Sequence, residues 1–109
     1  MLFRSPPKVD FTNARIEGNK LRLVFKAMDS FSTITRAEYS IDADDWQTAE
    51  PVGQISDYKV ENYDLTVPLP APDAKDPPTD EHTIVVRVFD RYENVGVAKA
   101  VIKTSRSPR

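Results

Sequence analysis

Residues 81–96, EHTIVVRVFDRYENVG, decide how the chain folds. Every second position of the first half is apolar and falls on one face: Ile84, Val86 and Val88. The intervening positions form a second, partly apolar face: Val85, Arg87 and Phe89. A period of two is the pattern of a β-strand, because successive side chains of a strand point to opposite sides of the sheet. The Asx-rich segment DRYENVG that follows predicts a turn.

The same alternation recurs along the chain. Together with residues 82–90 it predicts seven strands, the others lying near residues 9–16, 20–28, 33–41, 46–49, 61–67 and 96–104. No window of about eleven or more residues combines a period of 3.6 with helix caps. Nine prolines occur and cluster between the predicted strands, where no ladder donor is needed. Two further segments predict turns: EGNK, with Gly18 and Asn19, and DADDW at residues 42–46.

Short strands separated by turns predict an all-β sandwich or small barrel in this chain of 109 residues. The connection of residues 70–81 is long enough to carry the chain from one sheet to the other, as in a Greek key. We expect a flexible linker over residues 1–8, the folded domain over 9–104 and a flexible tail over 105–109. The predicted core, with Trp46 partly covered, contains Leu21, Leu23, Phe25, Ala37, Tyr39, Ile41, Leu65, Val67, Ile84, Val86 and Val88.

Composition excludes several kinds of chemistry. The chain has no cysteine, which removes disulfides, thiolate nucleophiles and Cys-based zinc sites. With 15 basic and 17 acidic residues the net charge is −2, so no overall field attracts nucleic acid or anionic lipid. No apolar run approaches the roughly 20 residues that span a bilayer, and we expect no membrane insertion. A cytoplasmic protein is one interpretation; the Pro-containing polar flanks RSPPK and SRSPR favour a domain of a longer chain.

The single histidine, His82, is a candidate general base or metal ligand. Arg87 lies on the opposite face of the same predicted strand, about 17 Å further along. Asp90 and Glu93 are more distant still, so these residues form no local catalytic constellation. No Gly-x-Ser-x-Gly, P-loop or His-Glu-x-x-His motif occurs. We therefore expect no enzymatic activity, no catalytic residue and no cofactor.

Two segments resemble bacterial immunoglobulin-like and fibronectin type III-like domains. They are AEYSIDADDW, residues 37–46, and EHTIVVRVFDRYENVGVA, residues 81–98. The resemblance implies an immunoglobulin/fibronectin III-like sandwich of about seven antiparallel strands. In such domains a tyrosine at the position of His82 often ties the long connection to the following strand, and a histidine can make that hydrogen bond through a ring nitrogen.

The chain departs from the family pattern in two turns. Ala43 stands where the family commonly has glycine after Asp42. Glu93 stands where glycine commonly precedes the position of Asn94. Both departures leave the turn types open without disturbing the strand pattern.

Members of the family are usually non-catalytic modules that space, orient or contact neighbouring domains. The resemblance implies that role here, as part of a longer bacterial protein in an extracytoplasmic compartment, with the partners being neighbouring domains of the same or another chain. A glycan- or other ligand-binding sandwich is the alternative. Its stacking platform would be formed by aromatic residues exposed side by side, drawn from Trp46, Tyr58, Tyr63 and Tyr92.

Two other kinds of ligand have a simpler explanation. The turns DADD and DRYEN concentrate oxygen ligands for calcium, but they match no EF-hand loop, and aspartates commonly cap turns through their own backbone. Lys99 and Lys103 share a strand face, with Arg106 and Arg109 following in the tail. Lysines protect strand edges against pairing, so we expect neither a metal site nor a nucleic-acid partner.

Overall fold

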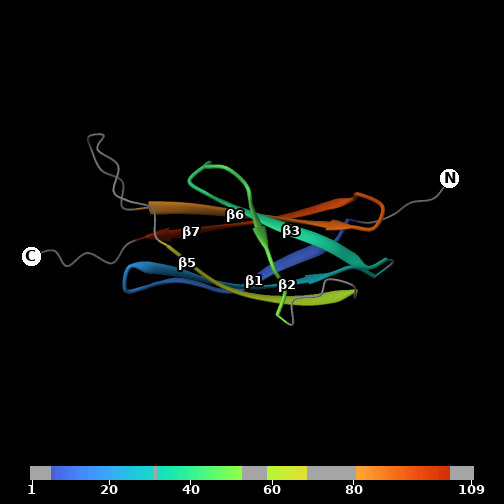
Figure 1. The fold of residues 1–109 in the computed structure, drawn as a ribbon, viewed down its shortest axis with the longest axis horizontal. Coiled ribbons are helices and arrows are strands. Elements are labelled where there is room, and N and C mark those ends of the chain that lie inside the picture. The colour runs from blue at the N-terminus through green and yellow to red at the C-terminus, as the bar shows by residue number, and fades with distance from the viewer. Residues whose placement is uncertain (1–5, 31, 53–58, 69–80, 104–109) are drawn as a thin grey trace, which may run out of the picture.

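Seven β-strands form two stacked sheets (Figure 1). The computed structural model describes residues 6–30, 32–52, 59–68 and 81–103. Within these ranges the strands are β1 (Lys8–Glu17), β2 (Lys20–Met28), β3 (Ile34–Ile41), β4 (Gln47–Ala49), β5 (Val60–Pro68), β6 (Glu81–Asp90) and β7 (Val95–Lys103). Each lies where the alternation predicts a strand, and β1 begins one residue before the expected start of the domain. In the described ranges, no helix is long and apolar enough to cross a membrane.

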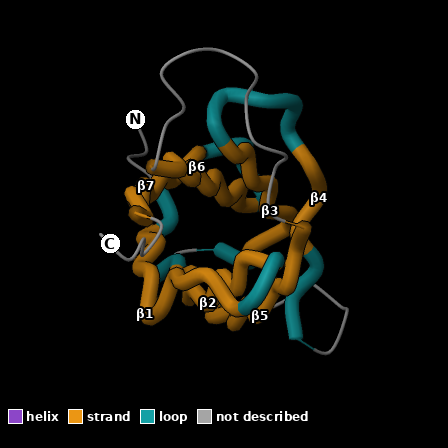
Figure 2. The backbone as a smooth tube through the Cα atoms, turned by 90° about the vertical axis from the view of Figure 1, so that its left-hand side faces the viewer, coloured by secondary structure: helices purple, strands orange, loops and turns teal. Residues whose placement is uncertain are grey.

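The strands pair antiparallel in the orders β1-β2-β5 and β4-β3-β6-β7. The two sheets are separate layers when the molecule is viewed end-on (Figure 2). β6 is central in the four-stranded sheet, where Ile84 stands opposite Ile41 of β3 and Ala100 of β7. After β4 the chain reaches the other sheet, and the Val52 N–H donates to the Asn62 carbonyl of β5 at 2.8 Å. The predicted all-β sandwich of seven antiparallel strands is confirmed, while most of the 70–81 connection lies outside the described residues.

The core fills the space between the inward faces of the sheets. The predicted core residues that are buried are Leu21, Leu23, Phe25, Ala37, Val67, Ile84, Val86 and Val88. The remaining three, Tyr39, Ile41 and Leu65, are partly buried and pack against this cluster. Tyr63 is fully buried and its ring stacks on Phe25, with 4.6 Å between the centroids. Aromatic area of this size is what a small sandwich needs in its interior.

Two of the turns hold non-glycine residues in the left-handed backbone region. Asp42 and Ala43 after β3 have φ of 55° and 64°, and Glu93 between β6 and β7 has φ of 66°. Ala43 and Glu93 are the two positions at which the sequence has no glycine where the domains it resembles commonly have one. The left-handed region costs an L-residue about 1–2 kcal/mol, because its Cβ comes too close to the following carbonyl oxygen.

We expect Ala43→Gly to raise the free energy of unfolding by about 0.5–1 kcal/mol. Relief of the left-handed strain exceeds the extra chain entropy that glycine gives the unfolded state, about 0.5–1 kcal/mol. Urea denaturation measures the change, with Ala100→Gly in β7 as the matched control. The control is expected to lose stability, since it introduces glycine into ordinary strand backbone; equal losses in both variants would contradict strain at Ala43.

Candidate functional site

His82, at the start of β6, binds the turn that follows β3. Its Nδ1 lies 2.7 Å from Oδ2 of Asp42, and Oδ1 of Asp42 accepts the Thr83 N–H at 2.8 Å. The Asp42 N–H donates in return to the Thr83 carbonyl at 2.8 Å. The imidazole, only 9% exposed, therefore fastens β6 to the end of β3. A hydrogen bond through a ring nitrogen is present as the resemblance implies, but its partner is a carboxylate beside β3, and residues 69–80 lie outside the described ranges.

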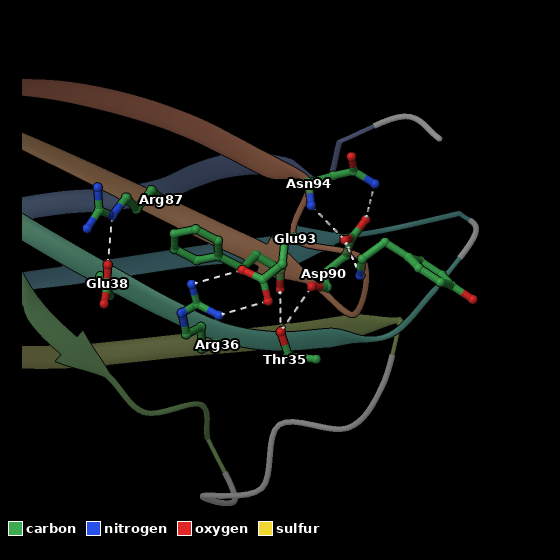
Figure 3. A network of polar contacts seen from close by, with 9 residues as sticks. Thr35, Arg36, Glu38, Arg87, Asp90, Glu93 and Asn94 are labelled. Atoms are coloured by element: carbon green, nitrogen blue, oxygen red, sulfur yellow. Dashed lines mark hydrogen bonds and ion pairs between the residues drawn. The ribbon is translucent and has the colours of Figure 1, made fainter. Parts of the chain in front are cut away.

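Asp90 ends β6 and organises the turn to β7 (Figure 3). Its side chain is fully buried, at 0% exposure. Oδ1 accepts the backbone N–H groups of Tyr92 at 2.8 Å and Asn94 at 2.9 Å, and Oδ2 accepts the Asn94 side-chain amide at 3.0 Å. The Thr35 hydroxyl of β3 lies 3.2 Å from the carbonyl oxygens of Phe89 and Asp90. The turn predicted from DRYENVG is confirmed, and this aspartate is its cap.

The hydrogen bonds to Asp90 decide its charge state. Burial by itself would raise the pKa of this carboxyl. The bonds from Asn94 and Tyr92, with a further side-chain contact to Asp29, outweigh burial and hold the pKa below its ordinary value of 3.8. The group is therefore ionised at neutral pH.

A lowered pKa in the folded state predicts acid sensitivity. The stabilisation from ionised Asp90 is fully present above the unfolded-state pKa of about 3.9, and is lost as the pH falls through the lower folded-state value. Urea denaturation between about pH 7 and pH 2 measures the free energy of unfolding across this window. Asp90→Asn cannot titrate, so its stability is expected to fall less steeply with acid than that of the wild type. Parallel curves would show that another group causes the acid loss.

Arg87 belongs to a row of stacked cations and aromatic rings on the outer face of the four-stranded sheet. Its guanidinium lies 3.8 Å from the ring centroid of Trp46 and 5.5 Å from that of Phe89. Arg36 covers Phe89 from the β3 side at 3.7 Å. The Arg87 Nε donates to Glu38 at 2.7 Å, and Arg36 binds both Glu93 oxygens at 3.2 and 3.3 Å. Guanidinium groups stack well on aromatic faces, so this row stabilises the outer surface of the sheet.

His82 and Arg87 of the opening stretch are thus kept apart from each other and from Asp90 and Glu93. His82 binds Asp42 at one end of β6, and Arg87 binds Glu38 midway along the strand. Asp90 and Glu93 lie together at the other end, where the Glu93 N–H donates to the Asp90 carbonyl at 3.0 Å (Figure 3). Sequence reasoning missed Arg36 and Phe89 as members of the stacked row. The period of two placed Phe89 on the face of Arg87, but the sequence contains no signal that β3 supplies the second cation.

Most of the described residues considered as metal or sugar ligands make contacts within the domain. Among the described residues, no group of three or more His, Asp or Glu side chains is placed to hold a metal ion. Of the four aromatics considered for a platform, Tyr63 lies in the core and Tyr58 lies outside the described ranges. Trp46 is 39% exposed but carries Arg87 on its ring, and Tyr92 is exposed in the β6–β7 turn.

The exposed face beside the stacked row is apolar. Val95, Val97 and Val101 of β7 are 39%, 61% and 52% exposed, and Val85 of β6 lies between them opposite Lys99. We call these four residues the valine strip. Lys103, at its end, lies 3.7 Å from Glu81, while Arg106 and Arg109 fall outside the described residues.

Comparisons with known proteins bear on the fold. No protein-family model and no curated protein matches the chain. Among solved structures, the chain is similar to one from the sulfane dehydrogenase SoxCD of Paracoccus pantotrophus, with a TM-score of 0.63 and 17% sequence identity. The match covers 94% of this chain and 33% of the SoxCD chain, so this chain spans about a third of the length of the SoxCD chain. Likeness at this identity shows a shared fold.

Proposed function

We propose that the chain is a non-catalytic accessory module of the immunoglobulin/fibronectin III-like type, which spaces, orients or contacts neighbouring domains of a larger, extracytoplasmic bacterial protein. The strand order supports this type. The orders β1-β2-β5 and β4-β3-β6-β7 correspond to the immunoglobulin orders A-B-E and C′-C-F-G, with β4 in the C′ position. The two segments that resemble the family include most of β3 and all of β6.

A contact role is supported by one observation: the reactive side chains bind within the domain, while apolar side chains are exposed on its surface. Three residues carry side chains that could act in catalysis or ligand binding: His82, Arg87 and Asp90. Each of them binds another part of the domain itself. Three of the four residues of the valine strip, by contrast, are exposed on a regular sheet: Val95, Val97 and Val101. Groups committed to holding a fold together are poor catalysts, whereas an exposed apolar surface is typical of a site that another protein covers.

The structural comparison supports a module within a longer chain. A sandwich similar to this one occupies a third of the SoxCD chain, so the fold occurs as one part of a larger protein. A domain that exposes an apolar strip on one face of a sheet is suited to contacting its neighbours.

Analysis of the native gene product tests the proposal. The protein is purified from fractionated cells of the organism that carries the gene, and its mass is measured denatured and in solution. We expect it outside the cytoplasm, either in a polypeptide longer than 109 residues or bound stably to another polypeptide. A native product of this length that is monomeric and cytoplasmic would contradict the proposal.

A further inference from the structure

The outer faces of the two sheets differ in chemistry. On the three-stranded sheet, Arg22 of β2 binds Asp64 of β5 through two hydrogen bonds of 3.0 and 2.7 Å, and Lys26 is exposed further along β2. That face also exposes Met28 and Val60, at 43% and 44%, where β2 ends and β5 begins, so charged and apolar side chains share it. The face formed by β6 and β7 exposes a longer apolar row, formed by Val95, Val97 and Val101 of the valine strip.

Lys99 lies in the middle of the strip. It is exposed between Val97 and Val101 on β7 and stands opposite Val85 of β6. The other cations on this face have acidic partners: Arg36 binds Glu93, Arg87 binds Glu38 and Lys103 lies near Glu81. Within the part of the chain that the structure describes, Lys99 has no ion pair. A surface that covers the strip must therefore supply an acid, since burying an unpaired ammonium group is costly.

The position of Lys99 disfavours a second copy of this chain as the occupant. In a twofold contact centred on the strip, the same patch meets itself, so the two Lys99 ammonium groups would face each other. Antiparallel pairing of two β7 edges about their middle residue would also place these lysines opposite one another, which is destabilising. Charge complementarity favours a different surface.

We propose that the valine strip is the docking surface for a neighbouring domain whose contact patch is aliphatic and carries an aspartate or glutamate opposite Lys99. The inference rests on the proposed function and names the face that performs it. The valines provide apolar contact, and the lysine sets the register and selects the partner, because a surface without the acid would leave the ammonium group desolvated and unpaired.

Site-specific photo-crosslinking in the native gene product tests the contact. Val97→p-benzoylphenylalanine places the probe on the strip, and Lys26→p-benzoylphenylalanine places it on the outer face of the other sheet. We expect crosslinking from position 97 to exceed that from position 26 at least about tenfold. Mass spectrometry of the crosslinked peptide is expected to identify an aliphatic segment that contains an aspartate or glutamate.

Charge exchange then tests the role of the lysine. Lys99→Glu is expected to reduce the crosslinking at least about tenfold, and changing the identified acid to lysine is expected to restore it. Lys99→Gln gives an intermediate loss, and Lys26→Glu, the matched control, leaves the yield unchanged. Lys99 and Lys26 are both exposed, so we expect none of these substitutions to change the stability of the domain. Urea denaturation curves that match the wild type confirm that each variant is folded.

Three results would overturn the proposal: crosslinks to a second copy of this chain, equal yields from both faces, or a yield that does not depend on the charge at position 99. If the native product lies in a larger protein but shows any of these results, the docking face is wrong and the accessory role stands. If the native product is a lone monomer, the accessory role itself fails. The two failures are therefore distinguishable.

Discussion

Replacing Asp90 by alanine is expected to lower the free energy of unfolding by about 3–5 kcal/mol. The carboxylate accepts the N–H groups of Tyr92 and Asn94 and the Asn94 amide while fully buried. The three hydrogen bonds are part-buried, and a donor left without its acceptor costs up to about 1–3 kcal/mol. A loss of this size is a large share of the 5–15 kcal/mol that stabilises a typical domain.

Asp90→Asn is the matched control for this substitution. It keeps one oxygen that can accept the two backbone N–H groups but removes the charge, so we expect a smaller loss of about 1–2 kcal/mol. Urea denaturation at neutral pH measures both variants. If alanine and asparagine destabilise the protein equally, the acceptor oxygens are not what holds the turn.

Gly96→Ala is expected to lower the free energy of unfolding by about 1–3 kcal/mol, through overpacking. A Cβ built on Gly96 would overlap the carbonyl oxygen of Pro7. Because the obstacle is backbone, β1 has to move away from β7 at its start. Amide exchange at Val9 and Phe11, on β1, is expected to accelerate in the same variant.

Gly18→Ala separates steric overlap from backbone strain. Gly18 has open space around its missing side chain but a φ of 67°, so alanine there costs strain alone, about 1 kcal/mol. Its effect is expected to stay in the β1–β2 turn, leaving amide exchange near Pro7 unchanged. Wild-type stability for Gly96→Ala would contradict the close approach of Pro7 to β7.

The strands could be predicted from sequence because burial on one face imposes a period of two. Leu21, Leu23 and Phe25 show it in β2, and Ile84, Val86 and Val88 show it in β6. Tyr39 and Leu65 follow the same period but are only partly buried. Periodicity specifies which face a side chain occupies; how completely it is covered depends on the other sheet.

The contacts of the candidate residues could not be predicted in the same way. His82 meets Asp42 across forty residues of sequence, and Arg36 meets Glu93 across fifty-seven. Such partners depend on the register between strands, which local pattern does not encode. Asp90 was the exception, because an aspartate that caps its own turn finds its partners within four residues. The turns that contain Ala43 and Glu93 were predicted with their types left open, and the left-handed φ values of both residues came from the structure.

The contact between Pro7 and Gly96 determines how the domain would carry mechanical load. It places the start of β1 beside the start of β7, and the two strands lie against each other at one edge of the sandwich (Figure 2). The described chain enters beside the first residues of β7 and leaves at the far end of that strand, at Lys103. Tension applied between the two ends of the described domain would therefore pull β1 and β7 lengthwise past each other. Force spectroscopy on an engineered tandem chain would measure this shear as high resistance to extension.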